Sequence, residues 1–506
     1  MREILKDLFQ LCLDSGKIPS DWMKAIIKPI PKSRENDPRI PLNYRGISLL
    51  CCSLKMFTNL INIRVLNVLN KCDELCDEQN GFRSDRSCTD HIFVLHSIVS
   101  QRLNLKLSTF ATYIDFSKAF DGISREMLLH KMLTYGIDGK LYFLLKYMYS
   151  QTEACVKVNN HHTDWFQTKT GVMQGDSFSP TAFNIFINDL AMSLKELNIG
   201  VKINNMCIPI LMYADDVVIL ANDEVELQTL LTHVNRWCKK WLMTVNLKKS
   251  KVMHFRPKNV NQCINDMYLG DDKLDYIDTY KYLGVYFNEH LDFQFHCNTL
   301  KDAGTRALGA VIGKFRELND LPYESFYKCF DSNVNPVTDY GAEVWGYMKD
   351  SSTDLVQLNA TKTFLGVHKF APNPGVLGDM GWTPSCIRRK ICLLRYWNRL
   401  INMNNSRLTK CIFNEDYKSN GTWCDSVKTI FKECNRYDIY VNRIPCDLAD
   451  IKQKLLSLYI AELKTKIEQM PKLRTYRQIK ENFETEYYVK INKDLYWPSC
   501  DWEYYL

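Results

Sequence analysis

The feature that most constrains this chain is a pair of adjacent aspartates, Asp215 and Asp216, set between two apolar runs. The residues before the pair are IPILMYA and those after it are VVIL. Short apolar runs rich in β-branched residues are typical of buried strands. We therefore expect a β-hairpin over residues 208–220 that carries both carboxylates near its turn. An exposed hairpin with a solvated Asp-Asp turn is the alternative, because acidic pairs are common in turns.

The two carboxylates also constrain what binds near them. A buried carboxylate without a partner is costly, and two neighbouring negative charges repel each other. A cation that neutralises the pair removes this cost. Mg²⁺ is suited to the task because it prefers hard oxygen ligands and combines few protein carboxylates with the phosphates of a nucleotide. The pair therefore predicts a magnesium site, with Mn²⁺ as the alternative ion.

A third acid, Asp115, ends a second apolar run that starts at Thr109. A strand that ends on an acid can bring its carboxylate beside the hairpin if both belong to one sheet. Three carboxylates can then hold two divalent ions, which stabilise the attacking and the leaving oxygen in phosphoryl transfer. Asp115, Asp215 and Asp216 are the predicted metal ligands and catalytic residues.

The phrases DFSKAFD at 115–121 and YADD at 213–216 resemble the palm motifs of reverse transcriptases from non-LTR, LINE-type retrotransposons of the jockey and CR1 kind. Further motifs follow in the family's order between residues 28 and 287. The resemblance implies an RNA-directed DNA polymerase that extends a primer 3′-hydroxyl with dNTPs on an RNA template. It also implies an α+β right-hand polymerase fold of fingers, palm and thumb. The palm sheet is expected to be antiparallel, and a mainly helical C-terminal region is expected to follow.

The resemblance further suggests how the chain is divided. Interleaved fingers and palm are expected in residues 1–290, a thumb-like helical region in 291–404, and a region without an assigned role in 405–506. Elements of this class usually carry an endonuclease before the polymerase, whereas this chain begins almost directly in the fingers. A polymerase lacking the N-terminal endonuclease is therefore expected.

Two basic residues are expected near the incoming nucleotide. Lys32 and Arg45 match positions where the family places basic side chains against the triphosphate or the template. A guanidinium can grip phosphate oxygens at two points. Solvated charges at a strand edge are the alternative for both. Arg45 is expected between two strands, and Gly46 replaces the family's usual proline there.

Four further residues are expected around the nucleotide. Phe120 matches an aromatic that packs under the sugar, where a ring clashes with the 2′-hydroxyl that distinguishes RNA from DNA precursors; a core phenylalanine is the alternative. The carbonyl of Phe116 is expected to assist the metal ligands. Gln174 matches a nucleotide-contacting glutamine, and Gly175 closes a loop in which the backbone can approach a ligand.

The helix after this loop is predicted to begin with Ser179 as N-cap and Pro180 as its first residue. Its free N–H groups would face the loop and could bind phosphate or base edges. Other helices are expected near 3–13, 53–69, 125–133 and 141–149, and over 227–241, where apolar residues recur at helical spacing.

The remaining site expectations also come from the resemblance. Lys249 matches a lysine proposed to protonate the departing pyrophosphate, a role worth about 10²–10⁴-fold in rate; a lysine-rich run is otherwise typical of a solvated face. Arg83, Tyr213 and Gly284 are expected to contact the template or primer. Gly284 lies in YKYLGVYF, which resembles the primer grip, and an ordinary surface arginine is the alternative for Arg83.

Composition adds weaker constraints. The net charge of +7 permits a polyanionic partner without requiring one. The 19 cysteines are irregularly spaced and no leader peptide opens the chain, so reduced thiols in an intracellular protein are expected. No apolar run reaches about eighteen residues, so no membrane span is expected. The sequence decides neither between nucleus and cytoplasm nor which protein partners the chain has.

An inactive or truncated nucleic-acid-binding remnant of such an element is the alternative function. The presence of all three acids together with Phe120 and Gln174 counts against it, because decay usually damages such sites first. A polymerase of the group II intron or telomerase type is disfavoured because DFSKAFD and the thumb-region segments YGAEVWG (340–346) and FLGVHKFAPNPGVLGDMGW (364–382) resemble those of LINE-type elements.

Overall fold

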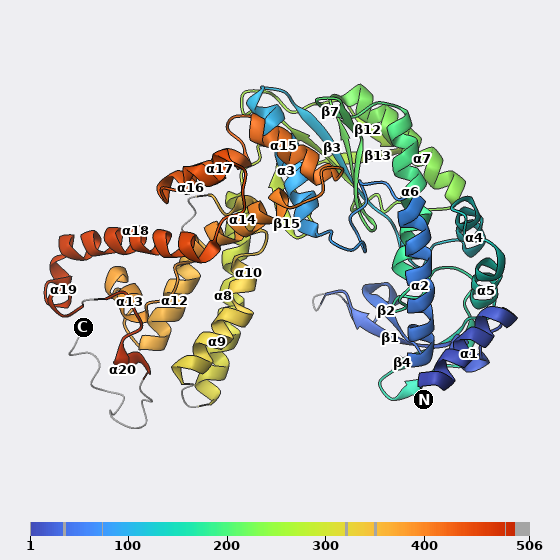
Figure 1. Ribbon diagram of the computed structural model, residues 1–506, viewed down its shortest axis with the longest axis horizontal. Helices are drawn as coiled ribbons and strands as arrows, with labels where there is room; N and C mark the ends of the chain where they lie inside the picture. Colours follow the sequence, from blue (N-terminus) through green and yellow to red (C-terminus); the bar gives the residue numbers. More distant parts are fainter. Residues whose placement is uncertain are drawn as a thin grey trace. The chain divides into compact units, whose positions relative to one another are not determined.

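The computed structural model describes residues 2–33, 37–72, 74–318, 322–348, 352–480 and 482–490 of the 506-residue chain (Figure 1). The chain separates into two compact units. Unit 1 comprises Met1–His91, Ser108–His254 and Val260–Ile277, and unit 2 comprises Ile92–Leu107, Phe255–Asn259 and Asp278–Leu506. The predicted boundaries at 290 and 404 between palm, thumb and C-terminal region stay predictions.

The centre of unit 1 is a six-stranded sheet in the order β12-β13-β11-β3-β10-β9. Its strands are β3 (Thr109–Asp115), β9 (Ile210–Tyr213), β10 (Asp216–Ala221), β11 (Lys251–Phe255), β12 (Met267–Leu269) and β13 (Asp272–Tyr276). β10 pairs antiparallel with both β3 and β9, as predicted for the palm. β3 and β10 are buried along nearly their whole length, and the less buried residue at one end of each strand is an acid, Asp115 in β3 and Asp216 in β10.

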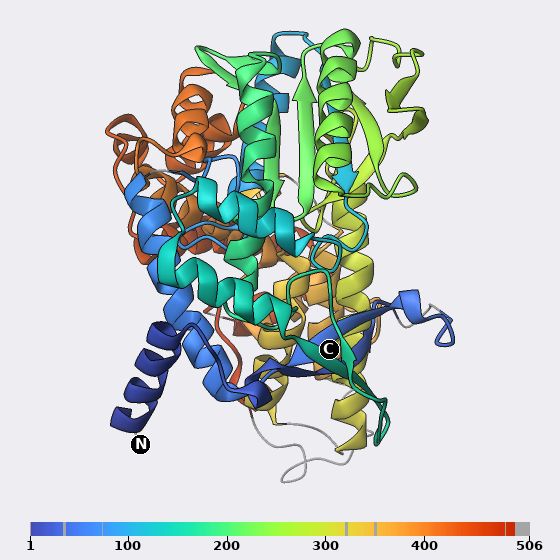
Figure 2. The same cartoon turned by 90° about the vertical axis from the view of Figure 1, so that its right-hand side faces the viewer.

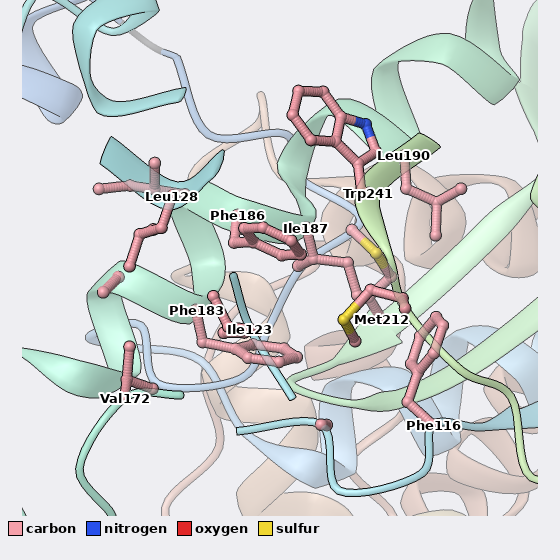
Figure 3. Close-up of a cluster of buried hydrophobic side chains, with 14 of the residues drawn as sticks. Phe116, Ile123, Leu128, Val172, Phe183, Phe186, Ile187, Leu190, Met212 and Trp241 are labelled. Atoms are coloured by element: carbon pink, nitrogen blue, oxygen red, sulfur yellow. The ribbon is translucent and has the colours of Figure 1, made fainter. Parts of the chain in front are cut away.

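Helices α6 (Ser179–Glu196) and α7 (Glu224–Trp241) pack beside this sheet (Figure 2). The apolar residues predicted to form one face of α7 are all buried. Figure 3 shows the core beneath the sheet, where Phe183 and Phe186 of α6 lie near Met212 of β9 and Phe116, which follows β3. This core holds the strand ends that carry the acids against a rigid support.

A smaller sheet in unit 1 has the order β2-β1-β4-β5, and β6 pairs with β4. Its strands are β1 (Lys24–Pro31), β2 (Tyr44–Leu49), β4 (Glu153–Val158), β5 (His161–His162) and β6 (Phe166–Gln167). The remaining elements of unit 1 are α1 (Arg2–Ser15), α2 (Cys52–Cys72), α4 (Arg125–Thr134), α5 (Gly139–Ser150), β7 (Val201–Ile203) and β8 (Met206–Ile208). The predicted helices near 3–13, 53–69, 125–133 and 141–149 are thus confirmed. Arg45 lies within β2 rather than between two strands, because its backbone pairs with Ile30 of β1.

Unit 2 is mainly helical, as predicted. Its helices are most of α3 (Cys88–Asn104), α8 (Gln294–Glu317), α9 (Tyr323–Asn333), α10 (Asn335–Thr338), α11 (Ala342–Trp345), α12 (Asp354–Leu365), α13 (Asn373–Met380), α14 (Ser385–Ile401), α15 (Leu408–Lys418), α16 (Trp423–Glu433), α17 (Tyr437–Val441), α18 (Leu448–Gln469), α19 (Tyr476–Ile479) and α20 (Tyr487–Lys490). A hairpin of β14 (Thr279–Tyr282) and β15 (Val285–Asn288) precedes α8. Within the described residues, no helix combines the length and apolarity needed to cross a lipid bilayer.

Two histidines are buried in unit 2 among aromatic rings. His96 stacks on Phe293 with 5.7 Å between ring centroids, and His296 meets the edge of Trp345 at 5.6 Å. Burial lowers the pKa of each histidine to about 4. Both rings are therefore neutral in the folded protein at neutral pH.

These histidines predict how the stability of the chain depends on pH. An unfolded histidine takes up a proton as the pH falls through about 6.5, whereas these two resist protonation until about pH 4. The free energy of unfolding should therefore decrease between pH 6.5 and 4, by up to about 1.4 kcal/mol per pH unit for each histidine. Thermal melting across this range should show a shallower pH dependence for His96→Gln than for wild type. The exposed control His161→Gln should keep the wild-type slope, and an unaltered slope in His96→Gln would contradict the assignment.

Candidate active site

The three acids named from the sequence converge at one end of neighbouring strands. Asp216 is the register partner of Asp115 across the β10–β3 ladder. Residues directly opposite each other in such a ladder have Cβ atoms about 4.5–5.5 Å apart. Asp215 lies in the two-residue turn between Tyr213 and Asp216, which pair with each other. The predicted hairpin with both aspartates at its turn is confirmed.

The electrostatics of these acids match a site built to receive positive charge. Burial first, and then the nearby charge of Asp115, raises the pKa of Asp215. Partial burial followed by the charges of Asp215 and Asp115 raises the pKa of Asp216 to about 6, although one side of this residue is open to solvent. Arg45 and Lys249 act in the opposite direction on both groups, so both cations lie within electrostatic reach of the acids.

The three carboxylates suit a hard cation that completes its coordination with water or substrate oxygens. Within the described residues, no three His, Cys, Asp or Glu side chains are gathered closely enough to enclose an ion by themselves. Mg²⁺ usually takes only one or two carboxylates and keeps waters or substrate phosphates for its other positions. Carboxylates on facing strands, with another in the adjoining turn, fit that mode of binding.

The segment after α7 holds Asp115 in place. Asn246 donates its backbone N–H to the Asp115 carbonyl at 2.7 Å and its side-chain Nδ2 to Asp115 Oδ2 at 3.0 Å. The Asp115 N–H donates to Ser250 Oγ at 3.1 Å. Lys249 Nζ lies 3.8 Å from Asp115 Oδ2, so the predicted proton donor is placed beside the acids. Asn246 and Ser250 received no role from the sequence, although they flank Lys249 in the same short segment.

Phe120 and Phe116 differ in exposure. Phe120 is half-buried, stacks on Phe183 with 4.7 Å between centroids, and meets the edge of Phe82 at 5.9 Å. One side of its ring is thus supported by the core while part of it stays accessible. Phe116 is buried, so its ring belongs to the core and only its carbonyl is a candidate ligand.

The loop with Gln174 and Gly175 is packed against protein on both sides. The Gln174 carbonyl accepts from the Ser48 N–H at 2.8 Å, and its side-chain amide donates to Asp121 Oδ1 at 3.2 Å. At Gly175, where φ is +123°, an added Cβ would lie 2.6 Å from the Ser48 carbonyl oxygen. The close approach that requires this glycine is therefore to the backbone of β2.

The basic residues predicted on the smaller sheet lie near acidic groups. Lys32 is exposed just after β1, and its charge lowers the pKa of Asp121, although burial raises that pKa by more. Arg45 is exposed on β2, and its charge acts to lower the pKa of Asp215 and of Asp216. The structure therefore brings Arg45 to the acids and Lys32 to the loop that carries Phe120.

Comparison with known proteins identifies the family. The family model "Reverse transcriptase (RNA-dependent DNA polymerase)" matches residues 30–287, which contain every site residue predicted above. The chain belongs to the reverse transcriptase family. The family model together with the retrotransposon relatives described next confirms the resemblance to polymerases of non-LTR retrotransposons.

Two relatives of this reverse transcriptase family member come from Drosophila melanogaster. The chain is 25% identical over 350 residues to "Probable RNA-directed DNA polymerase from transposon BS", covering 67% of this chain and 38% of that protein. It is 22% identical over 367 residues to "RNA-directed DNA polymerase from mobile element jockey", covering 71% and 39%. The chain thus spans about two fifths of the length of these relatives.

A telomerase structure from Candida tropicalis in complex with a telomeric RNA fragment aligns with a TM-score of 0.40, 14% identity, and coverage of 84% of this chain and 67% of that one.

In this reverse transcriptase family member, the predicted N-cap Ser179 is wrong. Ser179 is already the first residue of α6, and Phe178 occupies the N-cap position without a side-chain cap bond. The carboxylate of Asp176 accepts from the Phe178 N–H at 3.2 Å and from the Thr58 hydroxyl at 2.6 Å. The N–H of the N-cap residue is therefore already bonded to a side chain. An acid three residues before the helix was the signal that could have revealed it.

The residues expected to contact nucleic acid have different surroundings. Arg83 is half-buried and donates to the carbonyls of Leu75 and Cys76 at 3.3 and 2.6 Å, so its guanidinium serves the loop that carries it. Tyr213 is half-buried and pairs with Asp216 across the turn that contains Asp215. Gly284 lies in unit 2 with φ of +87°, in the β14–β15 turn, where an added Cβ would lie 2.5 Å from the Tyr340 ring. Contact of these residues with template or primer stays a prediction.

Proposed function

We propose that this chain is an RNA-directed DNA polymerase that extends a DNA primer 3′-hydroxyl with dNTPs on an RNA template. The observation that supports the proposal most strongly is the register of Asp115 opposite Asp216, with Asp215 in the adjoining turn. These three carboxylates would hold two Mg²⁺ ions, or Mn²⁺ in their place. When bound, the ions supply charge stabilisation at the attacking and leaving oxygens.

Three side chains near the acids have proposed roles in this reaction: one orients a metal ligand, one binds phosphate and one donates a proton. Asn246 holds one oxygen of Asp115 and so would fix the orientation of the carboxylate. Arg45 would bind phosphate oxygens near the acids, since its planar guanidinium is suited to them. Lys249 Nζ would donate a proton to the departing pyrophosphate. Positioning and preorganised charge supply most of the rate enhancement in this mechanism.

Primer extension with purified protein tests the proposal directly. An RNA template annealed to a labelled DNA primer should yield extended product that requires dNTPs and Mg²⁺. Asp272→Asn, which removes an exposed carboxylate at the start of β13, is the matched control and should retain full activity. A folded wild-type protein that binds the template–primer without extending it would favour the nucleic-acid-binding remnant instead.

The position of Phe120 predicts how the enzyme selects its sugar. Phe183 holds the Phe120 ring from one side, so removal of the ring would leave space for a ribose 2′-hydroxyl. Phe120→Ala should therefore lower the preference for dNTPs over rNTPs by at least about tenfold, the smaller end of steric discrimination in a pocket. Competition between the two nucleotides in primer extension measures this ratio. Phe143→Ala, which removes an exposed ring on α5, should leave the ratio unaltered, and unchanged discrimination in Phe120→Ala would remove Phe120 from this role.

A further inference from the structure

The turn that carries Asp215 is bound by one glutamine side chain from a distant part of the sequence. Gln79 Oε1 accepts from the Ala214 N–H at 2.9 Å and from the Gly81 N–H at 2.7 Å. Gln79 Nε2 donates to the Ala214 carbonyl at 3.3 Å. The side chain is only 1% exposed, so water does not replace these bonds easily. One amide thus satisfies both backbone groups of the residue immediately before Asp215.

This arrangement continues a backbone pairing. The Asn80 N–H donates to the Met212 carbonyl at 2.9 Å, and the Met212 N–H donates to the Glu78 carbonyl at 2.8 Å. Segment 78–81 therefore lies along the free edge of β9. At Ala214, where φ is +56°, the chain leaves the strand conformation and ordinary ladder bonds end. At Ala214 the Gln79 amide supplies the hydrogen bonds that a neighbouring backbone would supply within the ladder.

Segment 78–81 is itself anchored. Arg83 donates to the Cys76 carbonyl at 2.6 Å, and Arg86 pairs with Asp77 at 2.5 Å. Asn184 of α6 donates its Nδ2 to the Gly81 carbonyl at 2.9 Å. The arginines of QNGFRSDR thus stabilise the loop that presents Gln79, which gives them a role that contact with a template does not require.

We propose that Gln79 is a positioning residue for Asp215: its amide holds the backbone of Ala214 and thereby sets where the carboxylate points. The catalytic consequence rests on the proposed polymerase function, whereas the structural part does not. A hydrogen bond of this kind is worth roughly a factor of two to ten in the equilibrium between closed and open turn. A displacement of about 1 Å in a catalytic group can lower a rate about 10²-fold.

Hydrogen exchange tests the structural part without any need for activity. Gln79→Met keeps the side-chain length and removes all three bonds, so exchange of a peptide covering 211–217 should become about 10- to 100-fold faster. Gln79→Glu keeps an acceptor for both N–H groups but loses the bond to the Ala214 carbonyl when ionised. The exchange rate of Gln79→Glu should lie between those of wild type and Gln79→Met. This variant provides the test if Gln79→Met fails to fold.

Unit 1 offers a matched control for the glutamine. Gln228 pairs in the same way with both backbone groups of one residue, since it donates to the Tyr268 carbonyl and accepts from the Tyr268 N–H, each at 2.9 Å. This pair lies at β12, at the opposite edge of the sheet from β9. Gln228→Met should speed exchange around residue 268 and leave both the catalytic turn and primer extension unaltered.

Kinetics test the catalytic part. In Gln79→Met, kcat for primer extension should fall about 10²-fold while the Kd for template–primer stays within about threefold. Unaltered exchange over 211–217 in both Gln79 variants would overturn the proposal, as would a Kd that rises in parallel with the loss of kcat. If wild type proves inactive but the variants loosen the turn, the polymerase assignment fails and the structural role of Gln79 is supported.

Discussion

Replacement of Asp215 by asparagine is expected to lower the rate of primer extension at least about 10³-fold. The carboxylate lies in the turn beside the Asp115–Asp216 pair, where it would bind an ion that stabilises developing charge. Loss of several kcal/mol of such stabilisation corresponds to about 10³-fold or more in rate. Asparagine keeps the shape of the side chain, removes its negative charge and replaces one metal-binding oxygen by an NH₂ group.

The same substitution should not destabilise the fold. Burial and the charge of Asp115 raise the pKa of Asp215, which means that the ionised carboxylate is unfavourable in the metal-free protein. Asp215→Asn should therefore melt at the wild-type temperature or above it at neutral pH without divalent ions. Primer extension and thermal melting, measured together with Asp272→Asn, separate the two effects. Retained polymerase activity in Asp215→Asn would refute its role as a metal ligand.

Replacement of Gly81 by alanine should have the second-largest effect. An added Cβ would lie 2.2 Å from the Ala214 backbone nitrogen and 2.8 Å from its Cα. Because these are backbone atoms of the catalytic turn, no side-chain rotation can relieve the clash. Either segment 78–81 or the turn must move, so we expect primer extension to fall at least about 10²-fold. The melting temperature should also drop, by about 2–8 °C for a loss of 1–2 kcal/mol.

Gly309→Ala is the control for the added methyl group. Gly309 lies on the exposed side of α8, where a Cβ would meet no atom within 4 Å. Alanine there should stabilise the helix by up to about 1 kcal/mol. A Gly81→Ala protein with wild-type activity and melting temperature would show that the turn tolerates displacement.

The features predicted correctly from the sequence are those that depend on neighbouring residues. The hairpin follows from apolar runs on either side of Asp215 and Asp216, and the buried face of α7 follows from residues spaced three and four apart. The strand that ends on Asp115 is equally local. Pairing of this strand with the hairpin was expected because three carboxylates must lie close together to share metal ions. The register of β3 and β10 confirms the pairing.

The features that sequence reasoning missed depend on contacts between distant segments. Gln79 lies 135 residues before the turn that it binds, and no local pattern marks an amide that pairs with a remote backbone. Gly175 was expected where the backbone approaches a ligand, which stays a prediction, and the contact that the sequence did not reveal is its close approach to the Ser48 carbonyl. In each case one residue type suits both a ligand and a protein backbone, and only the fold decides between them.

Cleavage of the backbone by bound iron tests the central claim most directly. Fe²⁺ in place of Mg²⁺, with ascorbate and peroxide, generates radicals that cut the chain close to the metal. If Asp115, Asp215 and Asp216 share one site, cuts should appear together around residues 113–117 and 213–217, and excess Mg²⁺ should suppress both. Asp272→Asn should leave the pattern unaltered and Asp215→Asn should weaken both cuts. Cleavage at only one of the two segments, or at neither, would contradict a shared metal site.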